Sequence, residues 1–196
     1  MLSIDMTANL AKNVLEHIPE LVGQKISYLE IGTFEGGSAM WMLDNVLTHP
    51  DSRCYCVDNW HDVISRKKSR GGRRKTVWPG FEIEYAARKN LEKYGDRVVI
   101  EKGDSADVLN AWPHGRHQLA YVDGDHHYES CLKDSLAVWP LVDAGGVVIW
   151  DDFAVKPLAS RSRIQVGKAV TDFLRTVYGQ YEVLFSNNQM GVIKRA

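Results

Sequence analysis

The pattern of apolar and polar positions switches repeatedly between the period of a strand and the period of a helix. Short, buried-type apolar runs predict five strands, at residues 26–32, 53–60, 97–103, 117–125 and 145–153. Helical spacing of apolar residues predicts helices between and around them, at residues 6–23, 38–49, 81–95, 105–112, 128–142 and 166–179. Residues 181–196 predict two further strands, joined at Asn187-Asn188, which is a hairpin signal.

Five repeats of strand and helix predict an α/β fold with a parallel sheet covered on both faces. Right-handed crossovers make this a Rossmann-like doubly wound sheet, to which the C-terminal hairpin adds an antiparallel strand. Ligands of such sheets bind outside the carboxyl ends of the strands. We expect one domain over residues 1–196, with an N-terminal helix in 1–24, a basic loop or lid in 60–79 and a substrate-side insert in 153–166.

Composition limits the class of protein and its location in the cell. A chain of 196 residues with 44% hydrophobic and 25% charged residues is typical of one globular domain. Its apolar runs are too short to span a bilayer, and its first residues do not resemble a secretory signal. The cysteines, Cys54, Cys56 and Cys131, predict buried thiols rather than a metal or redox site. We therefore expect a cytoplasmic protein with no membrane partner.

The net charge of −1 hides an uneven distribution. Residues 66–75 hold seven Lys/Arg and no acid, which leaves 17 basic against 25 acidic residues elsewhere. This run is too short and isolated to predict nucleic-acid binding on its own. It is either a solvated loop or a lid whose charge attracts an anionic acceptor.

Every one of the five predicted strands ends in a carboxylate. The five ends carry Glu30, Asp58, Asp104, Asp123 and the pair Asp151-Asp152. Carboxylates gathered at one edge of a sheet repel one another, so we expect a cation or many hydrogen bonds to offset the repulsion. The candidate chemistry therefore lies at this edge.

The first strand end is a glycine-rich turn before a helix. Gly32 and Gly36 allow positive φ and close approach of a ligand, and the next helix offers free N–H groups. Thr33 and Phe34 stand where a G-x-G-x-x-G motif has its second glycine, which disfavours a pyrophosphate. Asp58, after the second strand, is placed to accept hydrogen bonds from ribose hydroxyls.

The fourth and fifth strand ends predict a metal site. Neighbouring parallel strands lie roughly 5 Å apart, so Asp123, Asp151 and Asp152 are expected to surround one hard divalent cation such as Mg²⁺. Capping of a loop is the alternative role for Asp152. A histidine beside such a site is a plausible general base, because the ordinary pKa of histidine lies near neutrality. His126 and His127 are therefore the candidates, and His61 and Tyr128 are weaker ones.

Two motifs carry a family resemblance. The pattern E-x-G-x-x-x-G-G-S at residues 30–38 resembles the first motif of class I S-adenosylmethionine-dependent methyltransferases. The block YVDGDHHY…GGVVIWDDF, residues 121–153, is similar to the metal-dependent O-methyltransferase branch with its sugar, macrolide and catechol-type members. The resemblance covers residues 28–152.

The resemblance implies methyl transfer from S-adenosylmethionine to a hydroxyl of a small-molecule acceptor. It implies catalytic roles for Asp123 and His126, the latter at the position where catechol-type members carry a lysine base. It implies magnesium at Asp123, Asp151 and Asp152. The implied cofactor-binding residues are Glu30, Gly32, Thr33, Phe34, Glu35, Gly36, Ser38, Asp58, Asn59, Trp60, Asp104, Ser105 and Asp123.

Three other functions stay open at this point. A metal-independent methyltransferase acting on nitrogen or a carboxylate would use the Asp pair for positioning only. An NAD-dependent oxidoreductase is disfavoured by the missing G-x-G-x-x-G and by the carboxylate cluster. An inactive module would bind nucleic acid through residues 66–75. The sequence also leaves the acceptor and the oligomeric state open, a homodimer included.

Overall fold

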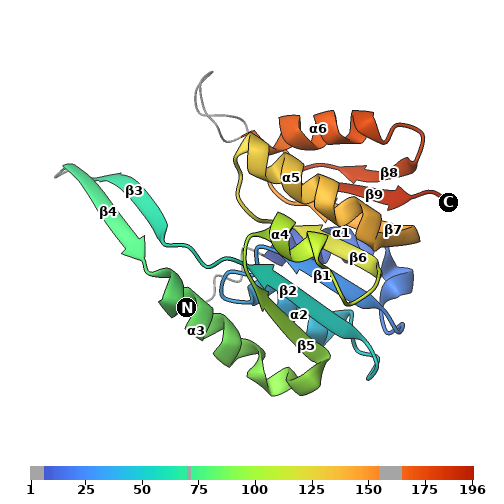
Figure 1. Cartoon of the computed structure of the whole chain (residues 1–196), viewed down its shortest axis with the longest axis horizontal. Coiled ribbons are helices and arrows are strands. Elements are labelled where there is room, and N and C mark those ends of the chain that lie inside the picture. Colours follow the sequence, from blue (N-terminus) through green and yellow to red (C-terminus); the bar gives the residue numbers. More distant parts are fainter. Residues whose placement is uncertain (1–6, 70–71, 155–164) are drawn as a thin grey trace.

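A seven-stranded sheet forms the centre of the molecule, as the sequence predicts (Figure 1). The computed structural model describes residues 7–69, 72–154 and 165–196, and the sheet order is β5-β2-β1-β6-β7-β9-β8. β9 pairs antiparallel with both β7 and β8, and the other pairs are parallel. The strands of this sheet are β1 (Ser27–Ile31), β2 (Arg53–Asp58), β5 (Val98–Lys102), β6 (His117–Val122), β7 (Val142–Trp150), β8 (Tyr181–Ser186) and β9 (Met190–Lys194).

Helices cover both faces of the sheet. One apolar cluster packs α1, α2 and the end of α3 on one face, and a second packs α4, α5 and α6 on the other. Successive residues of β6 alternate between them, Leu119 and Tyr121 in the first and Ala120 and Val122 in the second. The helices are α1 (Ala8–His17), α2 (Gly37–Asn45), α3 (Gly80–Leu91), α4 (Ser105–Asn110), α5 (Tyr128–Val138) and α6 (Val166–Thr176), with short 3₁₀ segments η2 (Pro19–Leu21), η3 (Glu92–Arg97) and η4 (Trp139–Leu141).

The first helix is shorter than its apolar pattern predicts. α1 ends at His17, whereas the spacing of apolar residues extends to Gly23. Pro19 is the physical reason: proline disfavours helical backbone at the preceding residue, and Ile18 has φ −137° and ψ 43°. The chain continues through Pro19 in the 3₁₀ turn η2.

The basic segment is a β-ribbon where the sequence predicted a loop. β3 (Val63–Ser69) and β4 (Gly72–Trp78) form an antiparallel two-stranded sheet separate from the main one. Figure 1 shows this ribbon projecting away from the body of the molecule. Its register places Arg66 opposite Lys75, with two more basic pairs beside them. The predicted insert at 153–166 falls mostly on residues 155–164, which lie outside the described residues.

A buried polar network ties α1 to the β8–β9 turn. The Asn13 side chain, 2% exposed, donates to Gln189 Oε1 at 2.8 Å and to Asn187 Oδ1 at 3.2 Å. Gln189 is fully buried, and its Nε2 donates to Asp151 Oδ1 at 3.1 Å. The network therefore joins the N-terminal helix, the C-terminal hairpin and the carboxyl end of β7.

Within the described part of the chain, no helix combines the length and the apolar character that crossing a bilayer requires.

Replacing Gln189 with alanine tests this network. The change removes one buried hydrogen bond from Asn13 and one from Asp151, so we expect the free energy of unfolding to fall by about 1–3 kcal/mol. Urea denaturation monitored by circular dichroism gives this value. The control is Gln180→Ala, because Gln180 is an exposed glutamine before β8. Equal stability of the two variants would contradict a stabilising role for the network.

Candidate functional site

The carboxyl ends of the parallel strands lie side by side and continue their hydrogen bonding past the last strand residue. Gly32 N donates to Val57 O at 2.9 Å, and Asp123 N donates to Ile31 O at 2.8 Å. On the far side of β6, Asp151 N donates to Val122 O at 3.0 Å. The residues that follow β1, β2, β6 and β7 are therefore held in one row.

Gly32 makes the closest contact in this row. Its φ is +88°, and an added Cβ would lie 2.0 Å from the carbonyl oxygen of Asp123. No side chain larger than hydrogen fits there, in addition to the strain of positive φ. The turn after β1 can therefore press against the end of β6 only because residue 32 is glycine.

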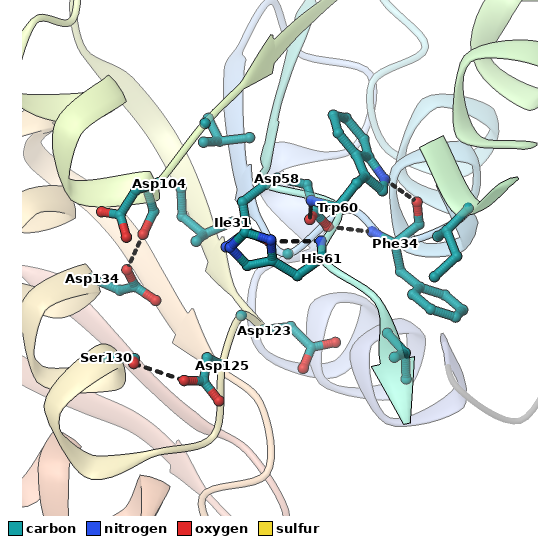
Figure 2. A pocket seen from close by; sticks show the side chains of 18 of the residues that line it. Ile31, Phe34, Asp58, Trp60, His61, Asp104, Asp123, Asp125, Ser130 and Asp134 are labelled. Carbon is teal, nitrogen blue, oxygen red and sulfur yellow. Dashed lines mark hydrogen bonds between the residues drawn. The ribbon is translucent and has the colours of Figure 1, made fainter. Parts of the chain in front are cut away.

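A cavity of about 500 Å³ opens at this edge (Figure 2). This volume lies within the usual range for sites that bind small molecules. Eight of the thirteen predicted cofactor residues line it: Gly32, Phe34, Asp58, Asn59, Trp60, Asp104, Ser105 and Asp123. His61, Asp125, Ser130, Lys133 and Asp134 also line it, so the structure adds polar groups that the sequence did not assign to a cofactor.

Asp58 connects the turns that follow β1 and β2. Its Oδ2 accepts a hydrogen bond from Phe34 N at 2.8 Å, and its Oδ1 accepts one from Trp60 N at 2.7 Å. Trp60 Nε1 in turn donates to Phe34 O at 2.9 Å. Burial raises the pKa of Asp58, and these amide donors oppose the rise. Each carboxylate oxygen keeps a second lone pair for a ribose hydroxyl.

Glu30 and Thr33 lie beneath the turn rather than on the cavity wall. Glu30 is fully buried, and Tyr28 Oη donates to its Oε2 at 2.7 Å. Glu30 Oε1 and Thr33 Oγ1 have no hydrogen-bond partner within the described residues. Burial raises the pKa of Glu30 to about 8. Glu35, Gly36 and Ser38 also lie outside the residues that line the cavity.

Asp104 and Ser105, the predicted cofactor contacts after β5, already form hydrogen bonds within the protein. Asp104 caps α4, since its Oδ1 accepts a hydrogen bond from Ala106 N at 3.1 Å. Ser105 Oγ donates to Asp134 Oδ1. Asp134 comes from α5, and burial raises its pKa to about 6. In the sequence it looks like an ordinary polar position of a helix.

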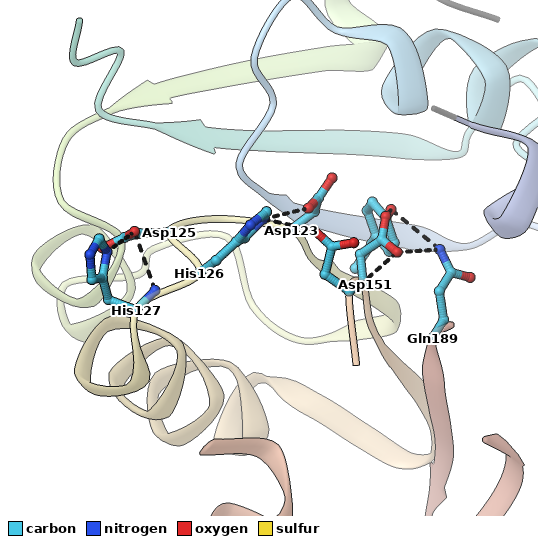
Figure 3. A network of polar contacts seen from close by, with 8 residues as sticks. Asp123, Asp125, His126, His127, Asp151 and Gln189 are labelled. Carbon is cyan, nitrogen blue, oxygen red and sulfur yellow. Dashed lines mark hydrogen bonds and ion pairs between the residues drawn. The ribbon is translucent and has the colours of Figure 1, made fainter. Parts of the chain in front are cut away.

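Asp123, which lines the cavity, forms a compact acidic cluster with His126 and Asp152. Figure 3 shows the His126 side chain directed toward Asp123. One ligand atom from each lies within 4.8 Å of the others. His126 Nε2 is 3.5 Å from Asp123 Oδ1 and 3.2 Å from Asp152 Oδ2. Burial raises the pKa of Asp123 to about 7, and the hydrogen bond with Asp123 raises the pKa of His126. Asp152 has φ +52°, so its backbone is strained.

Asp151, the third predicted metal ligand, points to different partners. Tyr121 Oη donates to its Oδ2, and Gln189 Nε2 and Asp152 N donate to its Oδ1 at 3.1 and 2.8 Å. Its negative charge still acts on the cluster, because it raises the pKa of both Asp123 and Asp152. The group within common ligand distance thus contains His126 where the sequence suggested Asp151.

Comparison with known proteins assigns this chain to a family. A family model described as a methyltransferase domain matches residues 29–153, which include every strand end of the site. The chain is a methyltransferase. It belongs to the class I, S-adenosylmethionine-dependent methyltransferases, as the motif at residues 30–38 suggested.

Individual relatives are distant. Protein R132 of Acanthamoeba polyphaga mimivirus is 25% identical over 180 residues, which cover 90% of this chain and 74% of that protein. The solved structure of the O-methyltransferase NovP matches with a TM-score of 0.69 at 18% identity. The match covers 99% of this chain and 81% of the NovP chain. MycE methyltransferase of the mycinamycin biosynthetic pathway was solved in complex with Mg and S-adenosylhomocysteine. It matches with a TM-score of 0.60 at 18% identity, and the match covers 94% of this chain and 49% of the MycE chain.

The structure separates the candidate bases of the methyltransferase. His126 lies in the acidic cluster, whereas His127 Nδ1 pairs with Asp125 at 2.6 Å. His61 lines the cavity. Tyr128 Oη donates to Asp172 of α6 at 3.0 Å and so faces away from the cluster. His126 is therefore the candidate that contacts both Asp123 and Asp152.

The raised pKa of Glu30 predicts how stability depends on pH. The folded chain keeps a proton on Glu30 up to about pH 8, whereas the unfolded chain releases it near its ordinary value of 4.5. Stability should therefore fall as pH rises through this window, by up to about 1.4 kcal/mol per pH unit. Glu30→Gln carries no such proton, so its urea stability should decline less between these pH values.

The control for this measurement is Glu16→Gln, because Glu16 is an exposed carboxylate on α1. This variant should lose stability with pH as the wild type does. Identical decline in Glu30→Gln and the wild type would show that Glu30 is not protonated in the folded chain.

Proposed function

We propose that this methyltransferase transfers the methyl group of S-adenosylmethionine to a hydroxyl oxygen of a small-molecule acceptor, with the help of a divalent cation, most simply Mg²⁺. The observation that carries the proposal is the position of Asp123. This residue both lines the 500 Å³ cavity and belongs to the acidic cluster with His126 and Asp152. A cofactor in the cavity would thus lie next to a group able to hold a cation and an acceptor.

The residues of the cluster fit a hard cation. Asp123 and Asp152 supply carboxylate oxygens, and Asp151 adds a third negative charge close by. MycE, with the same fold, was solved with Mg and S-adenosylhomocysteine. A divalent cation bound at Asp123 and Asp152 would hold acceptor oxygens and lower the pKa of the hydroxyl. The neighbouring carboxylates otherwise repel one another, which favours cation binding.

His126 is proposed as the base. The acceptor oxygen forms a bond to the methyl carbon while the bond from that carbon to the sulfonium sulfur breaks, which leaves a neutral thioether. The hydroxyl proton passes to His126 Nε2, and the resulting imidazolium is stabilised by Asp123 and Asp152 at 3.5 and 3.2 Å. Alignment of oxygen, carbon and sulfur then supplies most of the rate enhancement.

The acceptor is proposed to be anionic. The β3–β4 ribbon begins at Val63, which lines the cavity, and residues 66–75 of its sequence hold seven Lys/Arg and no acid. A segment with this charge attracts anions. An acceptor that bears a phosphate or a carboxylate would supply such an anion next to the cofactor.

The free, buried cysteines are compatible with the cytoplasm, which stays our predicted location.

The function can be tested by methyl transfer with and without a chelator. Incubation with S-adenosylmethionine and a panel of hydroxyl acceptors, with and without a phosphate or carboxylate group, should give a product one methyl group heavier in mass spectrometry. EDTA should abolish product formation, and excess Mg²⁺ should restore it. Transfer that is unaffected by EDTA would instead support a metal-independent enzyme, and transfer to nitrogen or a carboxylate would exclude the proposed acceptor class.

Asp152→Asn tests the cation site directly. Removal of one carboxylate charge should weaken Mg²⁺ or Mn²⁺ binding by about tenfold or more, measured by calorimetry, while S-adenosylhomocysteine still binds. The matched control is Asp125→Asn in the loop after β6, because Asp125 pairs with His127 and Ser130 outside the cluster. Equal cation affinity in both variants would contradict the assignment.

A further inference from the structure

The outer side of α3 carries aromatic side chains that the described part of the chain leaves uncovered. Phe81 is 71% exposed and Tyr85 is 67% exposed, and their spacing places both rings on one side of the helix. The opposite side of α3 packs Ile83 and Ala87 against Trp60. Neither Phe81 nor Tyr85 lines the cavity. The two rings therefore belong to a surface separate from the methyl-transfer site.

This surface continues to the base of the β3–β4 ribbon. β4 ends at Trp78, which is 43% exposed, and α3 begins at Gly80. Lys89, one helical turn beyond Tyr85, is exposed as well. Single exposed apolar side chains are common, but a succession of them marks an interaction site. We call the three exposed rings, Trp78, Phe81 and Tyr85, the aromatic strip.

The ribbon places a strong positive charge beside the aromatic strip. Residues 66–75 hold seven Lys/Arg and no acid, whereas the rest of the chain has 17 basic against 25 acidic residues. Figure 1 shows the ribbon extending from the beginning of α3, away from the body of the molecule. The segment is therefore accessible to a polyanion, which its charge attracts.

We propose that the β3–β4 ribbon and the aromatic strip bind single-stranded nucleic acid, with the phosphates at the basic ribbon and unpaired bases stacked on Phe81 and Tyr85. Proteins that bind single strands without sequence preference combine these two features, positive charge for the backbone and aromatic faces for the bases. A double helix would leave the rings without a partner, because its bases are already stacked on one another.

The composition of the ribbon favours a nucleic acid over the other large polyanion, an anionic membrane. Segments that bind at a membrane surface bury apolar side chains among the lipids in addition to their basic contacts. Residues 66–75 consist of Arg, Lys, Ser and Gly only, so the projecting part of the ribbon has no apolar side chain to insert. Contact with phosphates needs none.

Fluorescence anisotropy with the full chain tests the proposal. The probes are a labelled, unstructured single-stranded RNA of about 15 nucleotides and an abasic strand of the same length, which carries the same phosphates but no bases. The wild type should bind the RNA about tenfold or more tightly than the abasic strand. Its affinity for the RNA should fall steeply as salt rises from about 50 to about 200 mM, because binding to phosphates releases counterions.

Tyr85→Ala removes one ring of the aromatic strip. The variant should bind the RNA about tenfold more weakly and the abasic strand as the wild type does, because the abasic strand has no bases to stack. Phe81→Ala should give the same result. The matched control is Tyr178→Ala, because Tyr178 is 86% exposed but precedes β8, at the opposite edge of the sheet from β5. This control should bind both strands as the wild type does.

Four results would overturn the proposal. They are no RNA binding at low salt, equal affinity of the wild type for the two strands, unchanged RNA affinity in both Tyr85→Ala and Phe81→Ala, and tighter binding to vesicles of anionic phospholipid than to RNA. If Tyr85→Ala lowered the molar mass in light scattering and kept its RNA affinity, the aromatic strip would be an interface between two copies of the chain instead. These measurements involve no methyl transfer, so their outcome is independent of the proposed acceptor.

Discussion

The contact between the turn after β1 and the end of β6 determines the geometry of the site. Gly32 presses against the carbonyl of Asp123 at a distance that excludes any Cβ, and Asp123 N bonds back to Ile31 O. This contact places Asp123 where it both lines the cavity and belongs to the acidic cluster. Were the two strand ends further apart, the cavity and the cluster would no longer share a residue, and the proposed methyl donor in one could not face the proposed acceptor in the other.

The crowding of carboxylates at the same edge is tolerated because each has its own partner. Backbone amides donate hydrogen bonds to Asp58. The side chains of Tyr121 and Gln189 donate to Asp151, and that of Ser105 donates to Asp134. Asp123 contacts His126. Burial, and to a lesser extent the neighbouring carboxylates, raise the pKa of Asp123 to about 7 and that of Glu30 to about 8. A sulfonium cofactor and a divalent ion both carry the charge that such an edge attracts.

The sequence predicted the sheet, its helices and the row of strand ends, because apolar periodicity and turn glycines are local signals. It did not predict the β3–β4 ribbon, because the run of seven Lys/Arg in residues 66–75 lacks the alternation of apolar and polar residues that signals a strand. Asp134 was missed for a different reason: on a helix an aspartate gives no sign of burial, and its contact with Ser105 joins positions far apart in the chain. Likewise, the tie between Asp151 and Gln189 depends on β9 lying beside β7.

The position of β9 between β7 and β8 has a consequence for assembly. β8 is synthesised before β9, yet within the described sheet β9 is its only neighbour. β8 therefore belongs to the sheet only through its hairpin with β9, which pairs with the edge of β7. Gln189, which precedes β9, is held in place by that pairing and bonds Asp151. The acidic end of β7 thus has this hydrogen-bond donor only when the C-terminal hairpin is docked on the sheet.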